Sequence, residues 1–206
     1  MKEFFEKQIR TLEPVCDFPW HDARSYAQFL AQTYYYVCHT TRLLGLCASR
    51  IGIERERLHH RFLKHAAEER SHHVLAERDV AALGWSVASM PELPLTSALY
   101  ETQYYRAEHV SPTTIFGYIL ALEGVGVAYG RRIHEAVKRH HPAEACSFIK
   151  LHADADPEHL DAAFDAIASF TPAESQAIQA NFTFTCRLYL SLLASIRTAA
   201  ASSATT

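Results

Sequence analysis

The stretch HAAEERSH, over residues 65–72, places two histidines and a glutamate at regular offsets in a helix-favouring sequence. His65, Glu69 and His72 stand at positions i, i+4 and i+7. At about 100° per residue along an α-helix, positions +4 and +7 lie within roughly 40° of the starting direction. The spacing therefore predicts three metal-ligand side chains on one helix face, of the kind that helical bundles turn inward.

The stretch HADADPEH, over residues 152–159, repeats these offsets with His152, Asp156 and His159. Imidazole and carboxylate together suit iron or manganese, and helical bundles build two-metal sites from such side chains on neighbouring helices. The two stretches thus predict a centre of two Fe(2+) ions, with manganese as the alternative metal.

We expect a bridging carboxylate from a third helix. Glu123 is the one charged residue between His109 and Arg131, and burying an unpaired carboxylate in so apolar a helix is costly. A bound metal would remove that cost. Glycines at positions 117, 124, 126 and 130 of the same segment leave space either for close helix packing or for a ligand or dioxygen.

The rest of the chain is typical of an all-α protein. Apolar residues recur at helical spacing, and most of the eight prolines fall between segments rich in Ala, Leu, Glu and Arg. We expect one helical domain over residues 1–198 and a flexible tail over 199–206. The expected helices of this bundle cover residues 2–12, 22–50, 54–83, 96–109, 113–140, 143–165 and 173–198.

Length and composition exclude several classes of protein. The 206 residues suffice for one domain, and no uncharged apolar run approaches the ~18 residues of a membrane span. The acidic amino terminus does not resemble a signal peptide. A net charge of -3 offers no footprint for nucleic acid. Five scattered cysteines without a CxxC pair argue against a disulfide framework, so we expect a cytoplasmic protein, with a homodimer left open.

Pro157 interrupts the second ligand stretch, because it lacks a backbone N–H and its ring clashes with the carbonyl of Ala153. We expect either a kink here or a new turn that begins at Pro157 and is capped by Asp156. In both cases the metal held by residues 152–159 would be bound less tightly.

Candidate pocket residues are aromatic and cationic side chains on two of the expected helices. An inward arginine would suit a carboxylate of the substrate, so Arg42 or Arg106 is the expected anchor. We take Glu123, Arg42 and Tyr35 as the candidate catalytic residues. The wider set of pocket candidates is Tyr34, Tyr35, His39 and Arg42, with Tyr104, Tyr105 and Arg106.

From residue 26 to about residue 165, the sequence resembles the haem-oxygenase-like iron-containing oxidases, which are related to TenA-like proteins. The resemblance rests on the stretches 26–37, 65–72, 122–124 and 152–159, and on Asp79 followed by Leu83-Gly84. It implies a seven-helix fold. It also implies a non-haem diiron centre held by Glu69, His72, Glu123, His152, Asp156 and His159. His65 stands where some relatives carry a carboxylate, so the choice between His65 and Glu69 as ligand stays open.

The ligand set and the resemblance together predict an oxidoreductase that uses dioxygen to oxidise a small carboxylate-bearing metabolite, of the amino acid or fatty acid class. Three alternatives on this fold stay open. A haem-binding enzyme would use His21 or His39 as axial ligand, and a TenA-type hydrolase would use a cysteine nucleophile. A metal-free binding protein is the third alternative.

Overall fold

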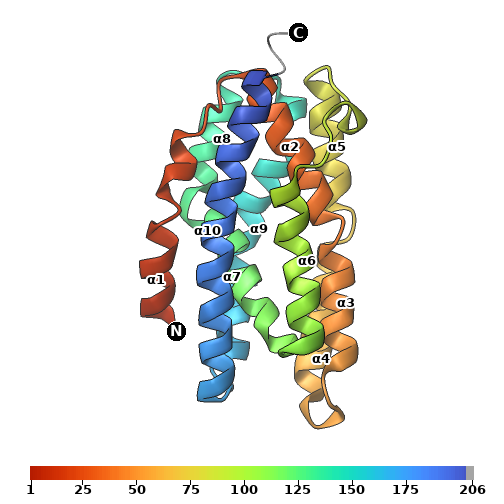
Figure 1. Ribbon diagram of the computed structural model, residues 1–206, viewed down its shortest axis with the longest axis vertical. Helices are drawn as coiled ribbons and strands as arrows, with labels where there is room; N and C mark the ends of the chain where they lie inside the picture. The colour runs from red at the N-terminus through yellow and green to blue at the C-terminus, as the bar shows by residue number, and fades with distance from the viewer. Residues whose placement is uncertain (203–206) are drawn as a thin grey trace.

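The computed structural model describes residues 1–202, with the side chains of residues 155–158 excepted. Every regular element in these residues is helical (Figure 1), which confirms the all-α prediction. The α-helices are α1 (Lys2–Arg10), α2 (Ala23–Val37), α3 (Thr40–Arg50), α4 (Glu56–Glu68), α5 (His72–Ala82), α6 (Pro94–His109), α7 (Ile115–Val125), α8 (Arg131–Lys138), α9 (Ser147–Ile167) and α10 (Pro172–Ser202).

Helix α7 forms the centre of the bundle. It packs against α9 and α10, while α2 packs against α5 and α10, and α3 pairs with α4 (Figure 1). All residues of α7 except Leu122 are buried, which explains why its sequence is almost wholly apolar. The helical stretch Pro112–Lys138 is long and apolar enough to cross a membrane by composition, but 72% of its most apolar window is buried inside the fold. It is a core helix of the bundle.

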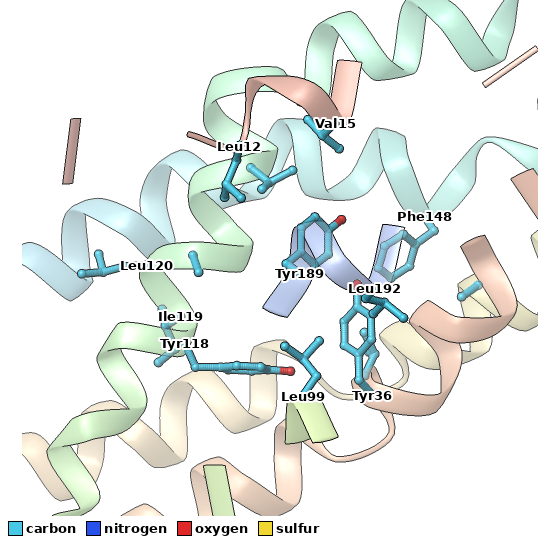
Figure 2. Close-up of a cluster of buried hydrophobic side chains, with 14 of the residues drawn as sticks. Leu12, Val15, Tyr36, Leu99, Tyr118, Ile119, Leu120, Phe148, Tyr189 and Leu192 are labelled. Atoms are coloured by element: carbon cyan, nitrogen blue, oxygen red, sulfur yellow. The ribbon is translucent and has the colours of Figure 1, made fainter. Parts of the chain in front are cut away.

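The hydrophobic core extends from α7 to the facing sides of α2, α6, α9 and α10. Figure 2 shows a part of this core in which three tyrosine rings lie among aliphatic side chains. These rings belong to Tyr36 of α2, Tyr118 of α7 and Tyr189 of α10, and all three are buried. Tyrosine is therefore part of the centre of this fold and not only of its surface.

Two helices expected from the sequence are each broken in two. The expected helix over 22–50 is divided at Cys38 and His39 into α2 and α3, and the one over 54–83 is divided at 69–71 into α4 and α5. Ser71 has a left-handed backbone with φ of 72°, which costs a non-glycine residue about 1 kcal/mol or more. No glycine or proline marks either break, so tertiary packing decides where these helices end.

The glycines of α7 and the following segment serve close packing. A Cβ on Gly117 would lie 2.5 Å from the Ile178 carbonyl oxygen, and one on Gly130 would lie 3.2 Å from Ala153 Cα. Residues Gly126–Gly130 form a π-helical turn between α7 and α8, which lies against α9. Such turns are frequent at functional sites. Of the two explanations for these glycines, close packing is therefore confirmed at 117 and 130.

Helix α9 runs as one element from Ser147 to Ile167. No new helix begins at Pro157, so that alternative for the second ligand stretch is wrong.

Candidate metal centre

The first ligand stretch lies at the break between α4 and α5, not on one continuous helix. His65 is in the last turn of α4, Glu69 follows its end, and His72 is the first residue of α5. The expected single stripe along one helix is therefore wrong. The turn at 69–71 nevertheless directs all three side chains toward α9, because His65, Glu69 and His72 all contact histidines of that helix.

The ligand side chains form two groups of three, each with one possible ligand atom per residue within 4.8 Å of the others. The first group is His65, Glu69 and His159, and the second is Glu69, His72 and His152. Glu69 belongs to both. Its Oε1 lies 3.7 Å from His65 Nε2 and 3.8 Å from His159 Nδ1, while its Oε2 lies 3.1 Å from His72 Nδ1. The two oxygens of Glu69 thus face different groups.

Glu123 comes to the first group from α7. Its Oε1 lies 2.9 Å from His65 Nε2 and 3.7 Å from His159 Nδ1. We had expected Glu123 to be the carboxylate between the two metals. In the described part of the chain, the carboxylate shared by both groups is Glu69, whereas Glu123 contacts His65 and His159 of the first group.

His152 is held in one orientation by its own helix. Its Nδ1 lies 2.9 Å from the Phe148 carbonyl oxygen, one turn earlier in α9. Because a carbonyl only accepts hydrogen bonds, Nδ1 carries the proton and Nε2 keeps a free lone pair. Burial lowers the pKa of His152. The neutral imidazole that results is the form that binds metals.

In the absence of metal, His65 and the carboxylates form a buried charged cluster. Burial lowers the pKa of His65, but hydrogen bonds and charges from Glu123 and Glu69 outweigh it and raise this pKa to about 9. Burial raises the pKa of Glu69, but His65 and His72 outweigh it and hold this pKa far below its ordinary value. His65 is therefore an imidazolium at neutral pH.

Several polar atoms of the cluster have no hydrogen-bond partner within the described residues. They are His65 Nδ1, His159 Nδ1 and Glu123 Oε2, and all three are buried. Buried polar atoms in folded proteins are nearly always paired, and exceptions point to a missing ligand, water or ion. Imidazoles and carboxylates are also the donors that iron and manganese prefer. The residues present therefore fit a pair of such ions.

The cluster forms one wall of a cavity of about 110 Å³. Its histidine and carboxylate lining residues are His65, Glu69, Glu123 and His152, and no lysine or arginine among the described residues lines it. The π-helical turn contributes Gly126 and Gly130, so these two glycines also border ligand space. The rest of the lining is largely aliphatic and aromatic: Phe29, Tyr36, Val37, Leu43, Leu44, Ile115, Tyr118, Ile119, Leu122, Val125, Ile133, Phe148, Ile149 and Tyr189, with Thr40 and Ala153.

The structure does not bring the expected anchors to this cavity. Arg42 is exposed and donates a hydrogen bond to the Cys38 carbonyl. The hydroxyl of Tyr35 donates to the Val87 carbonyl at 3.2 Å. Arg106 lies over the ring of Phe184, 5.2 Å from its centroid. The break after α2 and the packing of α6 against α10 direct these side chains elsewhere. The side chain of Asp156 lies outside the described residues.

The remaining pocket candidates also lie apart from the cavity lining. His39 stacks on Tyr100 with ring centroids 3.7 Å apart, and its Nδ1 lies 3.0 Å from the Tyr104 hydroxyl. Tyr34 contacts His73 through their rings, and Tyr105 is mostly exposed. These residues form aromatic contacts between α2, α5 and α6, not a pocket wall.

The tyrosines that do line the cavity were missed. They are Tyr36, Tyr118 and Tyr189. A signal existed for one of them, because Phe29 and Tyr36 are seven residues apart and therefore share a face of α2. For Tyr118 and Tyr189 no local signal exists, since α7 is apolar on every side and α10 must be placed in the bundle before its inner face is known.

Comparisons with known proteins agree with this fold. A crystal structure of a domain of unknown function with a heme oxygenase-like fold, from Shewanella denitrificans OS217, is similar with a TM-score of 0.84 at 20% identity. The similarity covers 94% of this chain and 90% of that one. A TenA homolog from Pseudomonas syringae pv. tomato DC3000 is similar with a TM-score of 0.75 at 12% identity, over 94% and 92% of the two chains. At these identities the likeness establishes the haem oxygenase-like fold alone.

No curated protein matches the sequence significantly. A family model described as iron-containing redox enzyme matches residues 27–194. That range contains all the histidines and carboxylates of the two groups, together with Glu123. The chain therefore belongs to the family of iron-containing redox enzymes.

Proposed function

We propose that the protein is an oxidoreductase that holds two iron ions and uses dioxygen to oxidise an organic carboxylate with an apolar chain. The observation that carries this proposal is the pair of ligand groups that share Glu69 at the wall of an apolar cavity. The family supports iron and redox chemistry. The number of ions, the use of dioxygen and the substrate class are our inferences from the site.

The residues of the two groups divide between the two ions. His65, His159 and Glu123 would hold the first, His72 and His152 would hold the second, and Glu69 would bridge them. Asp156 remains the further ligand that the sequence predicts on α9. Histidine and carboxylate ligands of this kind suit iron, and iron held by these residues would supply the redox chemistry with dioxygen.

The cavity lining favours a particular kind of substrate. A carboxylate in an apolar site needs a cation, and no arginine or lysine of the described residues lines the cavity. When His65 binds a metal as the neutral imidazole, the positive charge available there is that of the metals. We therefore place the substrate carboxylate at the polar wall formed by the ligand groups, with its apolar chain between Tyr36, Tyr118 and Tyr189. Amino acids with charged side chains fit this lining poorly.

The chain also excludes water from the site. Helix α7 supplies Ile115, Ile119, Leu122 and Val125 to the lining, so one side of the cavity is made almost wholly of apolar side chains. Exclusion of water strengthens electrostatic interactions in the site and suppresses side reactions with solvent. The protein thus contributes binding, orientation and a dry environment.

The alternatives fit the structure less well. The cysteines of the chain are free, but none of them lines the cavity, so a hydrolase with a cysteine nucleophile lacks its nucleophile there. A haem enzyme would need His21 or His39 at the site, and neither lines the cavity. The free cysteines also favour a reducing compartment, and we place the protein in the cytoplasm.

Anaerobic loading with Fe(2+), followed by metal analysis, tests the proposal. We expect up to two equivalents in the wild type. Glu69→Gln should lose both, because it neutralises the shared carboxylate, whereas Glu123→Gln should lose mainly the first. Glu77→Gln is the matched control, since Glu77 is an exposed residue of α5 outside both groups. Retention of two equivalents by Glu69→Gln would contradict the shared site.

Substrate binding is tested on the loaded protein exposed to dioxygen. Oxygen consumption should rise with medium-sized carboxylates that carry aliphatic or aromatic chains, and not with the corresponding amides or alcohols. Consumption that is the same with and without every carboxylate tried, in protein that holds no iron as isolated, would favour a binding role instead.

A further inference from the structure

Asp79 is a buried acidic residue that the proposed function does not use. It lies on α5 seven residues after His72, and its exposed fraction is 0%. Its Oδ2 accepts a hydrogen bond of 2.8 Å from the backbone N–H of Phe148 on α9. Ser147, the first residue of α9, also hydrogen-bonds to this carboxyl through its side chain and its backbone. A carboxylate so placed needs an explanation beyond solubility.

Phe148, whose backbone N–H donates to Asp79, also accepts a hydrogen bond from a candidate metal ligand, His152. The Phe148 N–H donates to Asp79, and the Phe148 carbonyl accepts from Nδ1 of His152 at 2.9 Å. The rings of Phe148 and His152 are also in contact, with centroids 4.1 Å apart. A continuous path of two hydrogen bonds therefore links the carboxylate of Asp79 to the imidazole of His152.

Helix α9 depends on Asp79 for its first turn. The first N–H groups of a helix have no partner inside the helix, and the N-cap residue Cys146 makes no side-chain cap hydrogen bond. Asp79 supplies an acceptor from another helix, with a negative charge that suits a helix N-terminus. It thereby joins α5, which begins at His72, to α9, which carries His152. These two histidines belong to the same ligand group.

We propose that Asp79 is a positioning residue for the second ligand group. By holding the Phe148 N–H, it fixes the register of α9 against α5 and, through the Phe148 carbonyl, the tautomer and orientation of His152. Nε2 of His152 is then presented to the metal. This inference rests on the proposed metal centre.

The cost of keeping Asp79 in this place supports a role in the site. Burial raises the pKa of Asp79 to about 6, against hydrogen bonds from the Phe148 backbone and from the side chain and backbone of Ser147. Its carboxylate is therefore ionised at neutral pH in an environment that disfavours the charge. No salt bridge to Asp79 exists in the described part of the chain, so the charge is compensated by the hydrogen bonds from Phe148 and Ser147.

The tautomer of His152 in metal-free protein is the first measurement. Two-dimensional ¹H–¹⁵N correlation of the histidine ring nitrogens distinguishes a protonated Nδ1 from a protonated Nε2. We expect the Nδ1–H tautomer in the wild type, and we expect Asp79→Leu to populate both tautomers. Asp79→Asn should keep the wild-type tautomer, because its amide oxygen still accepts from Phe148. A wild-type His152 with its proton on Nε2 would overturn the inference without any variant.

Iron affinity is the second measurement. Anaerobic calorimetric titration with Fe(2+) should show that Asp79→Leu binds the second ion with about tenfold lower affinity than the wild type, as is found for other residues that orient a metal ligand. The affinity for the first ion should be unchanged. Asp79→Asn should bind as the wild type does. Val80→Ala is the matched control, because Val80 is also fully buried on α5 but its loss removes only packing. It should lower stability and leave both affinities unchanged.

The two measurements separate this inference from the proposed function. A wild type that binds no iron defeats the proposed function, and with it the role of Asp79 in metal binding. A wild type that binds two ions, with Asp79→Leu binding both equally well, overturns the role of Asp79 alone. Equal weakening of both sites in Asp79→Leu, or loss of affinity in Val80→Ala, would show a general loss of packing and overturn it as well.

Discussion

Replacement of Asp79 by asparagine should make the stability of the metal-free protein less dependent on pH. The pKa of Asp79 is about 6 in the folded protein against an ordinary value of 3.8. A raised pKa means that the folded state is favoured below about pH 3.8 and loses this advantage as pH rises through about 6. The difference of about two pKa units corresponds to about 3 kcal/mol.

Asparagine keeps the shape and the acceptor of the side chain but does not titrate. The free energy of unfolding of Asp79→Asn, relative to the wild type, should therefore rise by about 2 kcal/mol between pH 4.5 and pH 8, where most of the difference develops. The buried NH₂ group of the variant lowers its free energy of unfolding by about 1 kcal/mol at every pH, which shifts the whole curve without changing this rise.

Urea denaturation of EDTA-treated protein at several pH values measures this difference directly, and the slope of the transition shows whether unfolding stays two-state. Glu77→Gln, an exposed change on the same helix, should show a difference within about 0.5 kcal/mol at every pH. A difference between Asp79→Asn and the wild type that is constant from pH 4.5 to pH 8 would refute the reasoning, because it would mean that the Asp79 pKa is not raised.

Four further predictions concern packing and the metal centre. Gly117→Ala should lower the free energy of unfolding by about 3 kcal/mol in urea denaturation, because its Cβ meets the Ile178 carbonyl at 2.5 Å. Gly45→Ala on α3, where nothing lies within 4 Å, should raise it by up to about 1 kcal/mol. The affinity for Fe(2+) should rise with pH up to about 9, because binding displaces a proton from His65. Calorimetric titrations in two buffers of different ionisation enthalpy measure the number of protons released on binding. No proton release at pH 7 would contradict this prediction. Calorimetry should also resolve two unequal affinities, with the weaker one lowered further by His152→Ala; two equal affinities would argue against the expected weakness around Pro157.

The identity of most candidate ligands follows from the sequence. The offsets of 65–72 and 152–159 single out histidines and carboxylates, and Glu123 stands alone in an apolar helix. These features are visible because side-chain chemistry and helical periodicity are local properties. The structure brings the described members of this set together.

The pocket could not be predicted in the same way. Arg42 is a candidate because an inward arginine would suit a substrate carboxylate, and Tyr35 because it lies on the same expected helix, yet the break at Cys38 and His39 leaves Arg42 exposed. Tyr118 and Tyr189 line the cavity instead. Which side of an apolar helix faces a cavity depends on the helices packed around it, and a single sequence does not contain that arrangement.

The sequence by itself determined the helical class, the approximate extent of most helices and the chemistry of the candidate metal centre. Only the tertiary structure decided that the chain turns at 69–71, that Glu69 lies between two ligand groups, and that Asp79 holds the first turn of α9. The physical reason is one of scale. Helix propensities of most residues differ by less than about 1 kcal/mol. The free energy gained when whole helix faces pack together is larger than these differences. Packing therefore sets where each helix ends and which side chains meet.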